Sequence, residues 1–154
     1  MTPAVALAKA KKINYFLHQY EHDPKSQSYG LEAAEKLSVE PPRVFKTLVA
    51  DVDGKLVVAV IPVVSQLSLK ALAKAAGGKK AAMADKQKVQ RATGYVLGGV
   101  SPLGQKQALP LFVDTSAQGF ATVYVSAGKR GLEIELAPSD LLQLANGQLA
   151  ELQA

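Results

Sequence analysis

The strongest hydrophobic pattern of the chain lies in residues 44–63, which read VFKTLVADVDGKLVVAVIPV. Two runs rich in valine and other apolar residues flank the dipeptide Asp53-Gly54. β-Branched residues favour strands, and Asp-Gly between two such runs favours a tight hairpin turn. The segment therefore predicts an antiparallel hairpin.

Shorter runs bounded by glycine, proline or polar residues predict the other elements. Strands are expected at residues 15–20, 95–99, 109–114, 121–127 and 131–137, with the turn AGKRG at 127–131 between the last two. Helices are expected at the N-terminus and at residues 31–37, 68–77, 85–94 and 139–147. Capping residues mark their ends, with polar N-caps at Thr2, Ser68, Asp85 and Ser139 and terminating glycines at Gly77 and Gly94.

The order of these elements indicates the fold class. Helices and strands are mixed without the regular alternation that builds a parallel doubly wound sheet. The hairpins favour a mixed or antiparallel sheet, and 154 residues are about the length of one domain. We predict an α+β fold, a single domain over residues 1–154 with a mixed, barrel-like β-sheet and surrounding helices.

The composition narrows the range of chemistry. The chain has no cysteine, which excludes a disulfide framework, a thiolate zinc site and a cysteine nucleophile. Its two histidines, His18 and His22, belong to no cluster with metal-ligand spacing, so neither a metal nor another cofactor is expected. No apolar run is long enough to cross a bilayer and no export signal is recognisable, so we expect the cytoplasm and no membrane partner.

Positive charge is concentrated in one segment of the chain. The net charge is +5, and residues 70–91 contain a single acid, Asp85, among the basic side chains Lys70, Lys74, Lys79, Lys80, Lys86, Lys88 and Arg91. A basic segment on an otherwise near-neutral chain is typical of a contact with a nucleic-acid backbone. The alternative is a solvated helix face without a partner.

Lys46 is the first candidate for chemistry because of its place in the hairpin. In a strand over residues 44–50, Lys46 lies on one face and Thr47 on the other, and the remaining residues are apolar. A lysine in such a strand extends to an edge, meets an anion or lines a cavity. The pattern alone leaves both a structural and a functional lysine open.

A glycine-rich segment at residues 98–106, GGVSPLGQK, is the second candidate. Its glycines, serine and proline interrupt an apolar pattern, which favours sharp turns with uncovered backbone. Such a loop directs backbone N–H groups at a carbonyl oxygen or a phosphate, but an ordinary tight turn is the alternative. It is not a Walker A loop, because Gln105 stands where that motif requires lysine.

Three segments are distinctive when taken together: FKTLV at 45–49, GYVLGGVSPLGQK at 94–106 and VSAGKRGLEIEL at 125–136. With these segments the chain resembles the YbaK/EbsC family of aminoacyl-tRNA deacylases, which are related to the editing domain of bacterial prolyl-tRNA synthetase. The resemblance runs nearly end to end. It implies a trans-editing hydrolase that deacylates mischarged tRNA, with cysteine on proline tRNA as the leading substrate.

The resemblance also implies a set of site residues. Lys46 and Gly98 take the catalytic roles: Lys46 contacts phosphate or ribose at the tRNA 3′ end, and the backbone around Gly98 faces the scissile carbonyl. The implied substrate-binding residues are Tyr20, Tyr29, Thr47, Gly99, Ser101, Pro102, Ser126, Arg130 and Glu133. Family members often have aspartate where this chain has Glu133, so the contact made by this longer acid stays open.

The implied mechanism suits a chain without an obvious general base. A cysteinyl thiol has a pKa of about 8.5, so a small fraction is thiolate near neutral pH and attacks the ester of its own amino acid. Two alternatives stay open: an Ala-tRNA(Pro)-type deacylase that uses water, and a non-catalytic module that binds tRNA or a synthetase. Aminoacyl-tRNA is the expected partner, with prolyl-tRNA synthetase as a second one.

Overall fold

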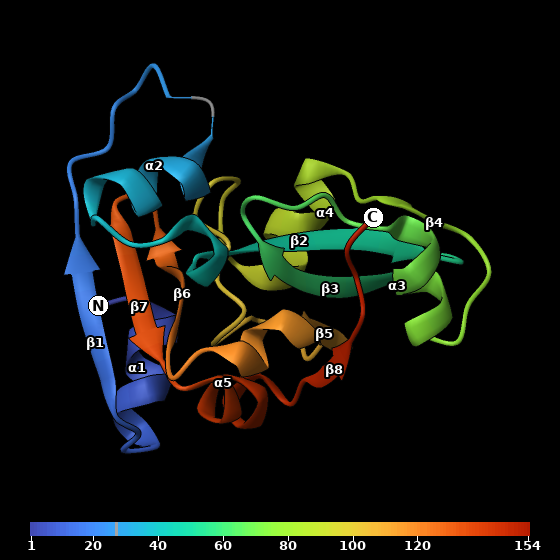
Figure 1. Cartoon of the computed structure of the whole chain (residues 1–154). Helices are drawn as coiled ribbons and strands as arrows, with labels where there is room; N and C mark the ends of the chain where they lie inside the picture. The colour runs from blue at the N-terminus through green and yellow to red at the C-terminus, as the bar shows by residue number, and fades with distance from the viewer. Residues whose placement is uncertain (27) are drawn as a thin grey trace.

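The computed structural model describes residues 1–26 and 28–154 (Figure 1). The described strands form two sheets, one of three strands and one of five, which a parallel bridge between Val44 and Tyr124 joins. Five α-helices surround them. The predicted α+β class with mixed strand directions is confirmed, although the described strands make two joined sheets and not a closed barrel.

The five-stranded sheet is built on the predicted hairpin. β2 (Phe45–Val52) pairs antiparallel with β3 (Lys55–Pro62). The turn residues have left-handed backbone, with φ of 51° at Asp53 and 89° at Gly54, which explains why Asp-Gly occupies this turn. The sheet continues with β4 (Ala81–Met83), antiparallel beside β2, and with β5 (Leu111–Asp114) and β8 (Gln148–Ala150), parallel beyond β3.

The three-stranded sheet has β7 (Leu132–Leu136) in its middle. β1 (Tyr15–Gln19) and β6 (Val123–Lys129) both pair with it antiparallel. The register of β6 shifts between Ser126 and Lys129, which places a bulge just before the tight turn. Bulges redirect side chains at the end of a hairpin, and this one lies at the edge of the site described below.

Three of the five helices begin at the N-caps that the sequence predicts, whereas the helix expected from residue 31 begins at Tyr29 and the last helix begins at Pro138. The five helices are α1 (Pro3–Ala10), α2 (Tyr29–Lys36), α3 (Leu69–Ala75), α4 (Lys86–Thr93) and α5 (Pro138–Ala145). The side chains of Thr2, Ser68 and Asp85 each accept a hydrogen bond from the first turn of their helix, as predicted. Ser139 is not a cap, because Pro138 already occupies the first helical position and Ala137 precedes it.

One predicted strand is wrong, and several short elements were not predicted. Residues 95–99 form a turn and not a strand, because Gly98 has a left-handed φ of 88° and the buried Tyr95 is tied by its hydroxyl to the Leu103 carbonyl at 2.6 Å. The unpredicted elements are β4, β8 and the 3₁₀ helices η1 (Pro41–Arg43) and η2 (Thr115–Gly119). All are too short to give a periodic pattern.

Packing of α2 creates the setting of the site. Its buried residues Ala33 and Ala34 share a small core cluster with Val44, Val63 and Tyr124, which come from the junction of the two sheets. A larger cluster fills the space below, between the sheets, α1 and α5. Figure 1 shows α2 above this junction and the loop that follows α4 (yellow) beside it.

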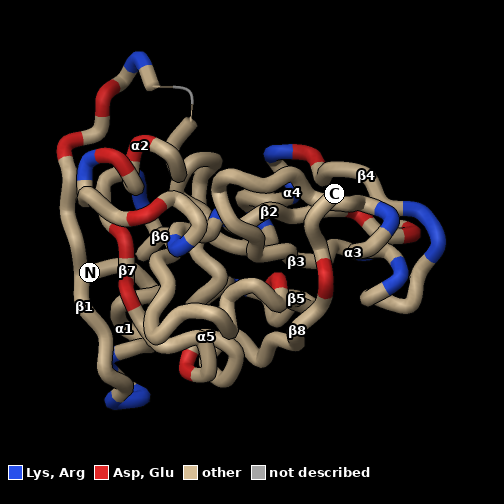
Figure 2. The backbone as a smooth tube through the Cα atoms, viewed as in Figure 1, with Lys and Arg blue, Asp and Glu red and all other residues tan. Residues whose placement is uncertain are grey.

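The basic segment lies away from that junction. Its lysines are exposed on and around α3, β4 and α4. Figure 2 shows blue positions gathered near α3 and β4, at the end of the five-stranded sheet farthest from β1. Residues 70–91 therefore form a surface of their own.

Candidate active site

A pocket of about 350 Å³ opens at the junction of the two sheets. Its walls come from segments far apart in the sequence: the end of β1, the start of α2, the first half of β2, the loop after α4, and the β6–β7 hairpin. The described lining residues are Tyr20, Ser28, Tyr29, Gly30, Phe45, Lys46, Thr47, Leu48, Val63, Leu97, Gly98, Val100, Ser126, Arg130 and Glu133. Among them are most of the predicted site residues.

Lys46 supplies a half-buried positive charge to this pocket. Burial lowers the pKa of its ammonium group, because the charged form loses hydration. Among the described residues, no carboxylate lies within ion-pairing distance of it. A partly desolvated cation without a protein counter-ion is suited to an anionic or strongly polar ligand.

Thr47 lies at an edge of β2 that none of the described strands covers. The Val49 carbonyl, two residues on, accepts a bond from the Ala84 N–H at 3.0 Å, beside β4. Backbone groups of alternate residues point to the same edge, so the N–H and carbonyl of Thr47 point there too. β4 pairs with β2 only from Ala50 onward, so it does not reach Thr47. The Thr47 Oγ1 is also buried and has no hydrogen-bond partner among the described residues.

Glu133 is a carboxyl group in an apolar setting. It is 7% exposed, and burial raises its pKa from an ordinary value near 4.5 to about 8. Beside it, burial and then the negative charge of Glu133 raise the pKa of Tyr20 to about 12. At neutral pH both groups are protonated, and each offers the pocket an O–H donor.

Arg130 and Tyr29 form a stacked pair at the pocket. The guanidinium carbon lies 3.8 Å from the centre of the Tyr29 ring, and Nη2 is hydrogen-bonded to the Tyr29 hydroxyl. A Cβ on Gly98 would lie 2.5 Å from the Arg130 Nε and 2.8 Å from the Tyr29 ring. Glycine is therefore required at position 98 both by its left-handed φ and by this close approach.

The glycine-rich loop divides into a part in the pocket and a part beneath it. The Gly99 N–H donates to the Val96 carbonyl at 3.0 Å, while the Gly98 N–H has no backbone acceptor among the described residues. A Cβ on Gly99 would lie 2.9 Å from the Lys129 Cα, so this glycine lets the loop pack against the β6–β7 turn.

Ser101 and Pro102 lie outside the pocket, although they were predicted with its residues. Ser101 is fully buried; its Oγ accepts from the Leu103 N–H and its carbonyl from the Gln105 amide. Pro102 lines a separate surface hollow beside α5. The structure brings Tyr20, Tyr29, Lys46, Thr47, Gly98, Ser126, Arg130 and Glu133 together, and it places Ser101 and Pro102 in the support of the loop.

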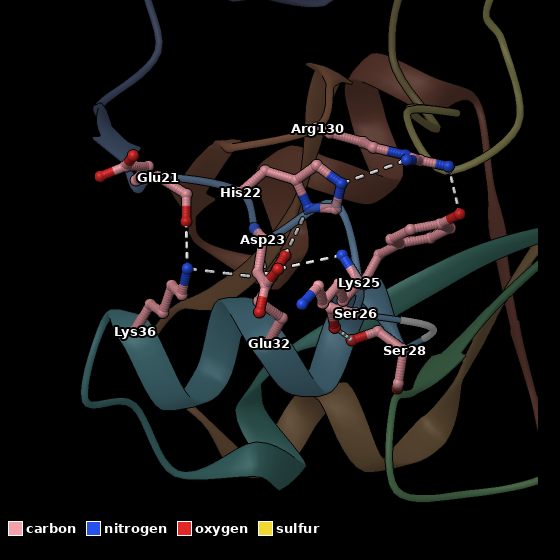
Figure 3. A network of polar contacts seen from close by, with 10 residues as sticks. Glu21, His22, Asp23, Lys25, Ser26, Ser28, Glu32, Lys36 and Arg130 are labelled. Atoms are coloured by element: carbon pink, nitrogen blue, oxygen red, sulfur yellow. Dashed lines mark hydrogen bonds and ion pairs between the residues drawn. The ribbon is translucent and has the colours of Figure 1, made fainter.

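Sequence reasoning missed a polar network behind Arg130 (Figure 3). The Arg130 Nη1 lies 3.1 Å from the His22 Nε2, and the His22 Nδ1 lies 2.7 Å from the Glu32 Oε1. Although burial opposes it, bonds from His22 and the Asp23 N–H hold the pKa of Glu32 below its ordinary value. No sequence signal points to this contact, because His22 and Arg130 lie 108 residues apart.

Residues 1–26 and 28–154 contain no cluster of three or more metal-ligating side chains. None of the helices described there has the length and apolarity needed to span a bilayer.

Comparison with known proteins assigns the chain to a family. Residues 25–144 match the aminoacyl-tRNA editing domain, and this stretch contains all the pocket residues except Tyr20. The chain belongs to the aminoacyl-tRNA editing domain family. The family resemblance seen in the sequence is therefore confirmed, together with the prediction of a domain that edits aminoacyl-tRNA.

Individual relatives agree with this assignment. The chain is 44% identical to EbsC of Enterococcus faecalis, named as a Cys-tRNA(Pro)/Cys-tRNA(Cys) deacylase, over 98% of this chain and 92% of that protein. It is 31% identical to a proline–tRNA ligase of Moorella thermoacetica, over 64% of this chain and 17% of the ligase. A crystal structure described as a trans-editing enzyme for prolyl-tRNA synthetase matches 100% of this chain and 99% of that one with a TM-score of 0.84; at 23% identity it shows the shared fold.

Proposed function

We propose that this member of the editing family is a trans-acting deacylase whose substrate is Cys-tRNA, with cysteine mischarged on proline tRNA as the preferred form. The name of the Enterococcus faecalis relative supports the substrate class. The observation that carries the proposal is the character of the pocket. Its described walls contain a cation without a counter-ion, a protonated carboxyl and apolar surface, but no histidine or cysteine that could act as base or nucleophile.

The substrate itself supplies the missing nucleophile. The cysteinyl sulfur, as thiolate, forms a bond to the carbonyl carbon of its own ester, and the bond from that carbon to the ribose oxygen breaks. The ribose oxygen takes up a proton equivalent to the one the thiol released, so that tRNA and a cyclic thiolactone leave. Positioning of reacting groups contributes up to about 7–11 kcal/mol, and one oxyanion donor about 3 kcal/mol.

The pocket residues have distinct roles in this proposal. Lys46 binds phosphate or ribose at the 3′ end of the tRNA, where its charge gains a counter-ion that the described part of the chain does not supply. The uncovered backbone of Thr47 and the Gly98 N–H provide donors for the ester and its developing oxyanion. Glu133, Tyr20 and Ser126 surround the amino-acid side chain with neutral donors and acceptors.

Assays on defined aminoacyl-tRNAs distinguish this function from its alternatives. Purified protein is expected to release tRNA from Cys-tRNA(Pro), and alkylation of the cysteinyl thiol is expected to stop the release. Undiminished hydrolysis of the thiol-blocked ester, or equal rates on Ala-tRNA(Pro), would indicate attack by water. Tight tRNA binding without cleavage of any ester would indicate a binding module.

A prolyl-tRNA synthetase is the second partner in this proposal. The relationship to part of a proline–tRNA ligase supports it, because a related editing domain then acts on the tRNA of that enzyme. Adding the synthetase to the assay is expected to raise the rate on Cys-tRNA(Pro) more than on Cys-tRNA(Cys). In this proposal the protein acts in the cytoplasm, where tRNA is charged.

A further inference from the structure

Arg130 is held at the pocket from two sides (Figure 3). On one side its guanidinium stacks on Tyr29, which also binds Nη2. On the other side Nη1 meets the Nε2 of His22, which lies in the segment between β1 and α2. His22 lines a second hollow with Arg130 but does not line the main pocket, so any role it has there acts through the arginine.

The direction of the hydrogen bonds follows from Glu32. This carboxylate is 6% exposed, is held ionised by its neighbours, and as an anion accepts hydrogen bonds without donating them. The Nδ1 of His22, 2.7 Å away, must therefore carry the proton. In the neutral ring the Nε2 is then an acceptor, and it faces an Arg130 nitrogen that is always a donor.

Glu32 itself is fixed independently of Arg130. Its second oxygen accepts the Asp23 N–H at 2.8 Å and lies 3.7 Å from the Lys36 ammonium. Figure 3 shows these bonds tying the segment after β1 to α2. The carboxylate orients the imidazole, and the imidazole presents one acceptor to the guanidinium, as carboxylate–histidine pairs orient metal ligands and catalytic groups.

We infer that His22, oriented by Glu32, is a positioning residue that sets the rotation of the Arg130 guanidinium over Tyr29. Without the Nε2 acceptor the planar guanidinium keeps its stacking contact and the single bond from Nη2 to the Tyr29 hydroxyl, and one such bond leaves it able to turn. With the acceptor, Nη1 and Nη2 are both engaged, so the guanidinium plane is fixed, with its Nε beside Gly98 at the wall of the pocket. This role rests on the proposed function, in which that guanidinium meets the end of an aminoacyl-tRNA.

Two substitutions separate the contact of His22 with Glu32 from its contact with Arg130. His22→Asn keeps a short amide donor for Glu32 but is too short to reach Arg130. His22→Gln carries its amide farther, to where its oxygen accepts from Arg130. We expect kcat/KM on Cys-tRNA(Pro) to fall about tenfold to hundredfold in His22→Asn, as for other misplaced groups, and to be largely retained in His22→Gln. Equal losses in the two variants would overturn the inference.

A double-mutant cycle tests whether His22 acts through the arginine. In an Arg130→Ala background, His22→Asn is expected to change kcat/KM by less than about twofold, since the group that it positions is gone. If His22→Asn lowers kcat/KM by the same factor in the Arg130→Ala background as in the wild type, His22 does not act through Arg130. His18→Ala is the matched control, because His18 also pairs with a carboxylate, Glu135 at 2.9 Å, but does not line the pocket.

A spectroscopic measurement tests the inference even if the protein cleaves no ester. The chain has three arginines, Arg43, Arg91 and Arg130, so the Nε–H signal of Arg130 is readily assigned by NMR with labelled arginine. A held guanidinium gives a separate, slowly exchanging signal, which we expect in the wild type and in His22→Gln but not in His22→Asn. The same held signal in His22→Asn would refute the positioning role, whereas absent cleavage with this expected NMR pattern would refute only the proposed function.

Discussion

At the scale of single residues, the site combines charges and polar groups that the protein itself leaves incomplete. Lys46 has no counter-ion among the described residues, Thr47 Oγ1 has no hydrogen-bond partner, and Glu133 is buried in protonated form. Each arrangement costs folding free energy, because polar groups lose water without a full replacement. Such a cost is typical of a binding site, where the ligand completes the contacts.

Lys46 is expected to favour activity at the expense of stability. Lys46→Met should lower kcat/KM about tenfold to hundredfold, since a hydrogen bond to a charged group contributes about 1.5–3 kcal/mol. The thermal midpoint should stay the same or rise, because a half-buried charge is removed. Lys55→Met, an exposed lysine of the same hairpin, is the control. A variant that loses both activity and stability would show that Lys46 is structural.

Glu133 is expected to make stability depend on pH in the direction opposite to most acids. Its folded pKa of about 8 lies above the ordinary value near 4.5, so the folded state binds the extra proton between these values. The free energy of unfolding should therefore fall as pH rises through this window, by up to about 1.4 kcal/mol per pH unit.

Urea titrations at several pH values between about 5 and about 8 measure this slope. Glu133→Gln should remove it and be relatively more stable at the alkaline end. A slope that persists unchanged in Glu133→Gln would assign the effect to another group.

At the scale of elements, the site depends on how closely a loop approaches the β6–β7 hairpin. Residues 95–99 lack the extended backbone predicted for them, and this turn brings Gly98 against Arg130 and Tyr29. Gly99 packs on Lys129 in the same region. The loop is thus a spacer whose small residues leave room for a stacked pair, and its uncovered backbone is a consequence of that packing.

Gly98→Ala is expected to displace Arg130 and Tyr29 and to reduce activity about hundredfold, as a displacement near 1 Å does in other enzymes. Gly54→Ala is a closely matched control, because Gly54 has φ of 89° against 88° at Gly98 but has nothing within 4 Å of an added Cβ. Both should lose about 1 kcal/mol of stability from backbone strain. Equal activity in the two variants would show that the close approach at Gly98 has no functional effect.

At the scale of the whole molecule, charge and pocket occupy different regions. The lysines of residues 70–91 lie around α3, β4 and α4 (Figure 2). The pocket lies at the junction with the three-stranded sheet. A tRNA whose 3′ end enters the pocket extends well beyond it, so a basic surface at a distance fits the acceptor stem. The alternative of a solvated face makes a different quantitative prediction.

Neutralising Lys74, Lys79 and Lys80 to Gln is expected to weaken tRNA binding and to reduce the slope of log affinity against log salt by about two to three. The matched control changes Lys9, Lys11 and Lys12, which are equally exposed and carry the same charge at the end of α1. Identical salt slopes in the two triple variants would mean that residues 70–91 do not touch the tRNA.

A structural feature could be predicted from the sequence when the contacts that fix it are made between residues close together in the chain. The β2–β3 turn and the caps at Thr2, Ser68 and Asp85 were correct from sequence, because each depends on residues that are neighbours in the chain. The strand expected at 95–99 was wrong, since the hydroxyl of Tyr95 bonds outside its own segment. Most of the residues that the resemblance implies for the site do line the pocket, but Ser101 hydrogen-bonds within the glycine-rich loop. No sequence pattern distinguishes a residue that lines the pocket from one that supports the loop.

By itself, the sequence determined the α+β class, the hairpin, the helix caps at Thr2, Ser68 and Asp85, and the family, because hydrophobic period, turn residues, caps and motifs each depend on residues close together in the chain. The tertiary structure alone decided that Lys46 has no carboxylate partner in residues 1–26 and 28–154, that Glu133 is protonated, and that His22 meets Arg130. The physical reason is that desolvation and hydrogen-bond partners depend on what packs against a group, and here those partners lie many residues away in the chain.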